Sequence, residues 1–255
     1  MATERFREFI KRGDALYYFN RYKQAIAEYE KAAAEDGNSV FPIHRIGYCY
    51  YLLGEMDKAA EINKVAFEKE PGYYYNFYLD GIIKIATNRS FEGIKSLLKS
   101  LETNPEYTPP YSALAQVYFK NNYPETSIKY AKQGLTIDPS VVRCHTALCG
   151  SYAKLKKREL FLNAAETALR MAPDNAEVHQ AIGWGYSQFE YYTEAKKHYN
   201  EALRLNPNSG TDKVLQPLGF LEAHSDYDSS YIWLIVRIGV LIIGVIAGIA
   251  KCSSG

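Results

Sequence analysis

The chain has 255 residues, of which 47% are hydrophobic, and its 30 basic and 29 acidic residues leave a net charge of +1. This length suffices for one elongated domain and a short further segment. The nearly balanced charge, without acidic or basic runs, argues against a nucleic-acid-binding protein. The four cysteines show no disulfide-framework spacing, which favours a reducing compartment.

Most of the chain repeats with a period of 34 residues. A proline recurs at this spacing, at Pro71, Pro105, Pro139, Pro173 and Pro207. After an N-terminal lead at 1–5, six contiguous repeats occupy 6–39, 40–73, 74–107, 108–141, 142–175 and 176–209. Their eighth positions are all small: Gly13, Gly47, Gly81, Ala115, Cys149 and Gly183. The pattern predicts stacked hairpins of two amphipathic helices, which approach closely at the small residues.

A few positions depart from this pattern. Phe161 stands where the other repeats carry a small residue, and Lys84 replaces an aromatic one. Residues 88–91 alter the sequence of the third turn. We therefore expect local repacking in repeats three and five.

These repeats resemble the tetratricopeptide repeat superfamily, and the resemblance covers residues 6–209, about four-fifths of the chain. It implies an all-α fold, a right-handed α-solenoid of six 34-residue helix-turn-helix repeats. In such a fold, the first helices line a concave groove that binds peptides or partner proteins. The family's groove positions predict a partner-binding set that is rich in aromatic residues: Tyr17, Tyr18, Phe41, Tyr48, Tyr51, Tyr75, Tyr78, Phe119, Arg143 and Trp184.

The resemblance does not extend to the chaperone-binding members of the family. Those members clamp a terminal carboxylate with a set of Lys, Asn and Arg side chains. The matching positions here are Ile10, Asp14, Arg45, Tyr75 and Leu79. The sequence therefore predicts a different kind of ligand.

A second signal lies at Tyr231 to Ala250, which reads YIWLIVRIGVLIIGVIAGIA and carries a single charge. Twenty helical residues span about 30 Å, the thickness of the hydrocarbon layer. We expect one C-terminal transmembrane helix at 231–250, after a capping segment and polar linker at 210–230 and before a short tail at 251–255. Arg237 would snorkel to the headgroups, and Tyr231 and Trp233 fit an interfacial aromatic belt.

Alternatives to this interpretation stay open. One alternative is a buried core helix of a soluble protein, although a helix that is apolar on every face needs a surrounding core that residues 210–230 cannot supply. Another is a functional role of Arg237 within the membrane in place of snorkelling. Gly244 and Gly248 form a GxxxG motif that would join two anchors in a homodimer. The N-terminus has no apolar signal segment, so we expect a single-pass membrane protein whose repeats lie in the cytoplasm.

No signature of catalysis, metal binding or cofactor binding occurs in the sequence. The five histidines form no i,i+4 pair, and there is no glycine-rich phosphate loop and no Gly-x-Ser-x-Gly motif. We therefore predict a non-enzymatic, membrane-anchored adaptor without cofactor, which recruits partner proteins or peptides and binds no nucleic acid. The alternative is a structural subunit that self-associates or packs permanently in a larger membrane complex.

Overall fold

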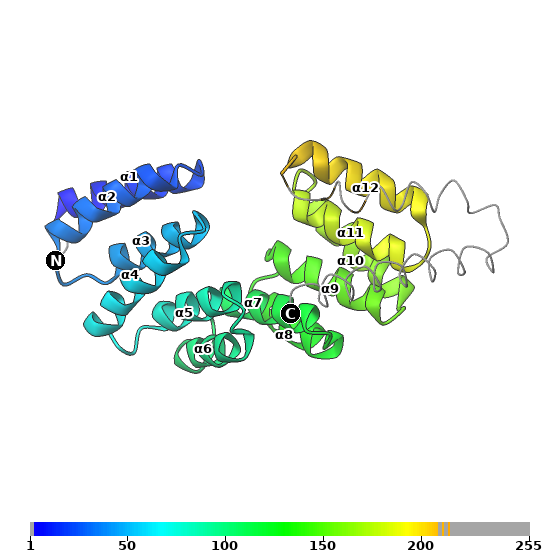
Figure 1. Ribbon diagram of the computed structural model, residues 1–255, viewed down its shortest axis with the longest axis horizontal. Coiled ribbons are helices and arrows are strands. Elements are labelled where there is room, and N and C mark those ends of the chain that lie inside the picture. The colour runs from blue at the N-terminus through cyan, green and yellow to red at the C-terminus, as the bar shows by residue number, and fades with distance from the viewer. Residues whose placement is uncertain (1–2, 209–210, 212–213, 215–255) are drawn as a thin grey trace, which may run out of the picture. The chain divides into compact units, whose positions relative to one another are not determined.

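The computed structural model describes residues 3–208, 211 and 214, and this part of the chain is all-helical (Figure 1). It contains no strand. The described helices are α1 (Glu4–Tyr18), α2 (Tyr22–Glu35), α3 (Phe41–Leu52), α4 (Met56–Lys69), α5 (Tyr74–Ala86), α6 (Ser90–Thr103), α7 (Pro109–Lys120), α8 (Pro124–Ile137), α9 (Val142–Lys154), α10 (Arg158–Met171), α11 (Ala176–Gln188) and α12 (Tyr192–Leu205). One helix pair corresponds to each predicted repeat, although α1 begins at Glu4, before the first repeat at 6–39. The chain divides into two compact units, unit 1 at residues 1–151 and unit 2 from Tyr152 onward.

The turn inside each helix pair has the same backbone conformation. One residue with a positive φ, between 57° and 77°, recurs every 34 positions: Asn20, Gly54, Asn88, Asn122, Lys156 and Glu190. Glycine and asparagine adopt this left-handed conformation at low cost. Asn88 has a φ of 62°, so the third turn keeps the common backbone conformation although the sequence at 88–91 is altered.

Small residues in unit 1 allow pairs of helices to touch. Gly81 on α5 faces Gly93 on α6, and a Cβ atom at Gly93 would lie 2.6 Å from the Gly81 carbonyl oxygen. Leu79 and Leu97 are fully buried on the same two helices. The eighth-position glycine of the third repeat therefore lies at a direct backbone contact.

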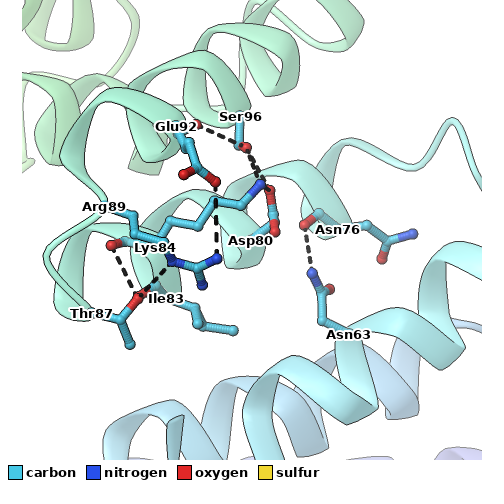
Figure 2. A network of polar contacts seen from close by, with 9 residues as sticks. All are labelled: Asn63, Asn76, Asp80, Ile83, Lys84, Thr87, Arg89, Glu92 and Ser96. Carbon is cyan, nitrogen blue, oxygen red and sulfur yellow. Dashed lines mark hydrogen bonds and ion pairs between the residues drawn. The ribbon is translucent and has the colours of Figure 1, made fainter. Parts of the chain in front are cut away.

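Lys84 is accommodated by a polar network between α5 and α6 (Figure 2). Its Nζ lies 2.6 Å from Oδ2 of Asp80, and Ser96 Oγ donates to the same oxygen at 2.5 Å. Nearby, the buried Asn63 of α4 donates through Nδ2 to the carbonyl of Asn76, at 3.0 Å. Repeat three thus replaces an aromatic contact with paired polar groups.

In unit 2, Phe161 of α10 is fully buried. Its ring fills the space beside Gly185 of α11, where any Cβ atom would overlap it. The ring also packs edge-on against Tyr186, with centroids 5.2 Å apart. The glycine in the next repeat compensates for the large side chain in the fifth.

The C-terminal predictions lie mainly outside the described residues. These include most of the capping segment and linker, the predicted transmembrane helix with Tyr231, Trp233, Arg237, Gly244 and Gly248, and the tail. Thr211 is described: it is buried and accepts a hydrogen bond from Gln180 Nε2 at 2.6 Å. Within the described part of the chain, no helix combines the length and the apolar character needed to cross a membrane.

Candidate functional site

A cavity of about 370 Å³ opens on the side of unit 1 that the first helices of the repeats form. We call it the tyrosine cavity. Helices α1, α3, α5, α7 and α9 and the segments just before α7 and α9 supply its walls. Its lining residues are Tyr17, His44, Arg45, Tyr48, Tyr75, Tyr78, Tyr107, Thr108, Pro109, Ser112, Val141 and Arg143.

The aromatic rings of the cavity form one connected surface. Tyr48 is central, with ring centroids 6.2 Å from both Tyr17 and Tyr78. Tyr107 then contacts Tyr78 edge-on at 5.5 Å and Tyr75 at 4.7 Å. Because adjacent helices each contribute rings, stacking of the repeats is what brings these residues together.

Three tyrosine hydroxyls of the cavity, those of Tyr17, Tyr78 and Tyr107, stay protonated. Burial, reinforced by neighbouring tyrosines, raises the pKa of Tyr17, Tyr78 and Tyr107 above the usual value for tyrosine. A protonated hydroxyl can donate a hydrogen bond to a ligand. These side chains are therefore neutral donors.

His44 has an unusual environment for a histidine. Its side chain is 3% exposed, and its ring centroid lies 4.3 Å from that of Tyr75. The Tyr75 backbone comes close to the ring, but neither ring nitrogen makes a hydrogen bond of ordinary geometry. Burial, together with the positive charge of Arg45, lowers the pKa of His44 to about 3. The imidazole is therefore neutral near pH 7, and both of its ring nitrogens are shielded from solvent.

Arg45 is held in place by a partly buried polar cluster. Its Nε donates to Oδ1 of Asp14 at 3.1 Å, its Nη2 forms an ion pair with the same oxygen, and Tyr29 donates its hydroxyl to that oxygen at 2.6 Å. The guanidinium carbon lies 4.7 Å from the ring centre of Tyr17. These contacts fix one positive charge in the cavity wall.

A second cavity, of about 480 Å³, adjoins the first. The two share Tyr78, Ser112 and Arg143, and the second extends along α5 and α7 past Tyr51 and Lys120. Among the described residues that line either cavity, there is no carboxylate side chain. The combined groove is therefore lined by aromatic rings and a few basic side chains, of which Arg45 is paired with Asp14.

The structure brings some of the predicted groove residues together and separates others. Tyr17, Tyr48, Tyr75, Tyr78 and Arg143 line the tyrosine cavity, and Tyr78 is only 6% exposed. Tyr51 lines the adjoining cavity. Tyr18 and Phe41 line a separate N-terminal cavity of about 600 Å³. Phe119 packs beside Gly150, and Trp184 packs on the Ala195 and Tyr199 cluster of unit 2.

Sequence reasoning missed three aromatic or charged residues of the cavity. His44 stands at the fifth position of its repeat, which is a groove position of the family, so the period itself could have identified it. Arg45 was considered only as part of the absent carboxylate clamp. Tyr107 is the last residue of its repeat, and no positional rule points to it; it reaches the cavity from the segment before α7.

Comparison with known proteins supports the repeat assignment. The family model of the tetratricopeptide repeat matches residues 109–141 and residues 176–209. No curated protein matches the chain by sequence.

Three solved structures share its fold. A chain of the APC/C hetero-tetramer Cut9–Hcn1 is 18% identical, with a TM-score of 0.73 over 82% of this chain and 42% of that chain. PilF of Pseudomonas aeruginosa is 17% identical, with a TM-score of 0.64 over 84% and 97% of the respective chains. YrrB, described as a TPR protein with an unusual peptide-binding site, is 15% identical, with a TM-score of 0.50 over 74% and 97%.

The present chain spans less than half the length of the Cut9–Hcn1 chain that it matches. At these identities, the likeness concerns the fold alone. Residues 109–141 and 176–209 are tetratricopeptide repeats, and they belong to an all-α helical-repeat fold of the α-solenoid class.

Proposed function

We propose that this chain is a non-enzymatic adaptor that binds a segment of a partner protein in the tyrosine cavity. The fold class suggests a protein-interaction scaffold, and peptide binding in the similar fold of YrrB agrees with that role. The observation that carries the proposal is the connected surface of rings from Tyr17 through Tyr48 to Tyr107, which lines an open cavity.

The physical basis is the favourable energetics of aromatic anchors. Tyr17, Tyr48 and Tyr75 are half-buried and keep part of their rings exposed. A tyrosine has only two side-chain torsions to order, so it supplies contact area at low entropic cost. Truncation of such an anchor in an interface commonly costs about 2 kcal/mol or more.

The binding test is a double variant, Tyr48→Ala with Tyr51→Ala, which spares the buried Tyr78. We expect the variant to keep its helical circular dichroism and its cooperative melting, and to lose most of the proteins captured by the parent. Lys64→Ala is the matched control, because Lys64 is exposed on α4, a second helix of a repeat. A folded double variant with an unchanged set of partners would refute the proposal.

The adaptor is anchored, in this proposal, by residues 231–250, with the repeats on the cytoplasmic side. The support is the sequence alone, twenty residues with one charge. The full chain should resist extraction by alkaline carbonate, and a chain ending at 230 should not pellet with membranes. Extraction of the full chain would contradict the anchor. Concentration-dependent sedimentation of the shortened chain would favour the self-associating subunit instead.

A further inference from the structure

We propose that His179 of α11 and His198 of α12 form a binding site in unit 2 for one divalent transition-metal ion of the kind that imidazole ligands prefer, Cu²⁺ or Zn²⁺. The Nδ1 atoms of the two rings lie 3.1 Å apart. The site is independent of the tyrosine cavity, because all lining residues of that cavity belong to unit 1.

The hydrogen bonds of His179 decide which of its nitrogens can bind an ion. Its Nε2 lies 2.8 Å from the carbonyl oxygen of Pro173. A carbonyl oxygen only accepts hydrogen bonds, so Nε2 carries the proton of the neutral ring and Nδ1 keeps its lone pair. Histidines that bind metals usually donate their other N–H in this way, which fixes the orientation of the ring. His179 therefore presents a lone pair to His198.

The bond to the proline carbonyl recurs in neighbouring repeats. At the position equivalent to His179, Tyr111 of repeat four donates its hydroxyl to the carbonyl oxygen of Pro105 at 3.0 Å. In repeat five, Nε2 of His145 lies 3.0 Å from the carbonyl oxygen of Pro139. The bond therefore accepts either side chain and does not require a second histidine.

Only the sixth repeat adds that second histidine. The positions equivalent to His198 in the five other repeats hold Glu28, Ile62, Ser96, Tyr130 and Ala164. The paired imidazoles are therefore a feature of one repeat and are not needed by the repeat fold itself.

The separation of the two nitrogens is close to that of a pair of metal ligands. Imidazole nitrogens lie about 2.0–2.1 Å from Zn²⁺, so two of them at a tetrahedral angle are about 3.3–3.4 Å apart. Without an ion, the Nδ1–H of His198 donates to the lone pair of His179. When an ion binds, His198 moves its ring proton from Nδ1 to Nε2, so both Nδ1 lone pairs face the ion and no proton is released.

The surroundings of the pair leave His198 able to bind an ion near pH 7. Burial, together with His179 and Lys197, lowers the pKa of His198 to about 4, so protons do not compete for its lone pair. The side chain is partly exposed, which gives the pair access to solvent. The nearby charges are mixed, since Lys197 disfavours a cation, whereas Glu201 interacts with His179 and favours one.

The remaining coordination positions of the ion belong to water. Among the described residues, no three histidine, cysteine or carboxylate side chains come close enough together to enclose an ion. Two imidazoles and water favour Cu²⁺, which binds nitrogen ligands most tightly among these ions. Mg²⁺ and Ca²⁺ prefer oxygen ligands and should bind poorly.

The test is a calorimetric titration of the full-length protein, in detergent micelles, with Cu²⁺ and separately with Zn²⁺. His198→Ala gives repeat six the combination found in repeat five, a histidine with an alanine, and should weaken binding at least about tenfold. His145→Tyr is the matched control, because it gives repeat five the tyrosine of repeat four, and it should bind as the parent does. Pulsed electron paramagnetic resonance should detect two imidazoles on one copper ion in the parent and not in His198→Ala.

Thermal melting gives a second measurement. An ion at five times its dissociation constant should raise the melting temperature of the parent by about 2–4 °C, and that of His198→Ala by less. If His198→Ala does not fold, His179→Tyr decides, because repeat four shows that a tyrosine fits this position. Equal affinity in parent and variant, a single imidazole on copper in the parent, or loss of binding in His145→Tyr would each overturn the inference and leave the pair as a hydrogen bond only.

Discussion

Gly93→Ala should destabilise unit 1, although alanine is the better helix former. A Cβ atom at position 93 would lie 2.6 Å from the Gly81 carbonyl oxygen, 2.6 Å from Cγ1 of Ile85 and 3.1 Å from the Ile85 amide nitrogen. Two of these three atoms belong to the backbone of α5. Relief of the overlap therefore requires α5 and α6 to move apart, rather than one side chain to change its rotamer.

The magnitude follows from two opposing effects. Overpacking of a tight contact costs about 1–3 kcal/mol, and a backbone obstacle favours the upper part of that range. Replacement of a helical glycine by alanine stabilises the helix by about 1 kcal/mol. The net loss of unfolding free energy should be about 1–2 kcal/mol. For a chain of this size, that loss lowers the melting temperature by about 2–8 °C.

Thermal melting followed by circular dichroism at 222 nm measures the effect. Gly37→Ala is the matched control, because an added Cβ at that position meets no atom within 4 Å. Its stability should stay within about 0.5 kcal/mol of the parent. A Gly93→Ala variant that melts at or above the parent temperature would show that α5 and α6 do not touch at Gly81 and Gly93.

Three further predictions concern named contacts. Tyr29→Phe should cost about 1.5–3 kcal/mol in denaturant titrations, because it removes the hydrogen bond to the charged Asp14; equal stability would contradict that bond. Gly185→Ala should destabilise unit 2 by overlap with Phe161, and the loss should be clearly smaller in a Phe161→Ala background, whereas simple additivity would disprove the compensation. Because the pKa of His44 falls from 6.5 to about 3 on folding, the unfolded chain takes up the proton first as the pH drops. The free energy of unfolding that is present above pH 6.5 should therefore fall by about 1.4 kcal/mol per pH unit towards pH 3. His44→Phe should show a flatter slope than the parent. The variant keeps a smaller slope of the same sign, because His198, of pKa about 4, is still present.

The 34-residue period predicted much of the local structure. Five of the six helix pairs fall within one predicted repeat, and only α1, from Glu4, begins before its repeat. The left-handed turn residue recurs at the same spacing even at Asn88. Helix formation and turn geometry depend on neighbours close in sequence, so a period in the sequence reports on them directly. The groove positions that the family resemblance implies include Tyr17, Tyr48, Tyr75 and Tyr78, which line one cavity.

The tertiary structure alone decided which side chains complete the site and how the exceptions are packed. Tyr107 enters the cavity from a connecting segment, while Phe119 packs beside Gly150. Phe161 fits because a glycine lies opposite it in the following repeat. His44 is buried because side chains of the neighbouring helices, such as Tyr75, cover its ring. Contacts of this kind join residues about one repeat apart in sequence, so they depend on the stacking of helices and on rotamers, which no single-repeat pattern encodes.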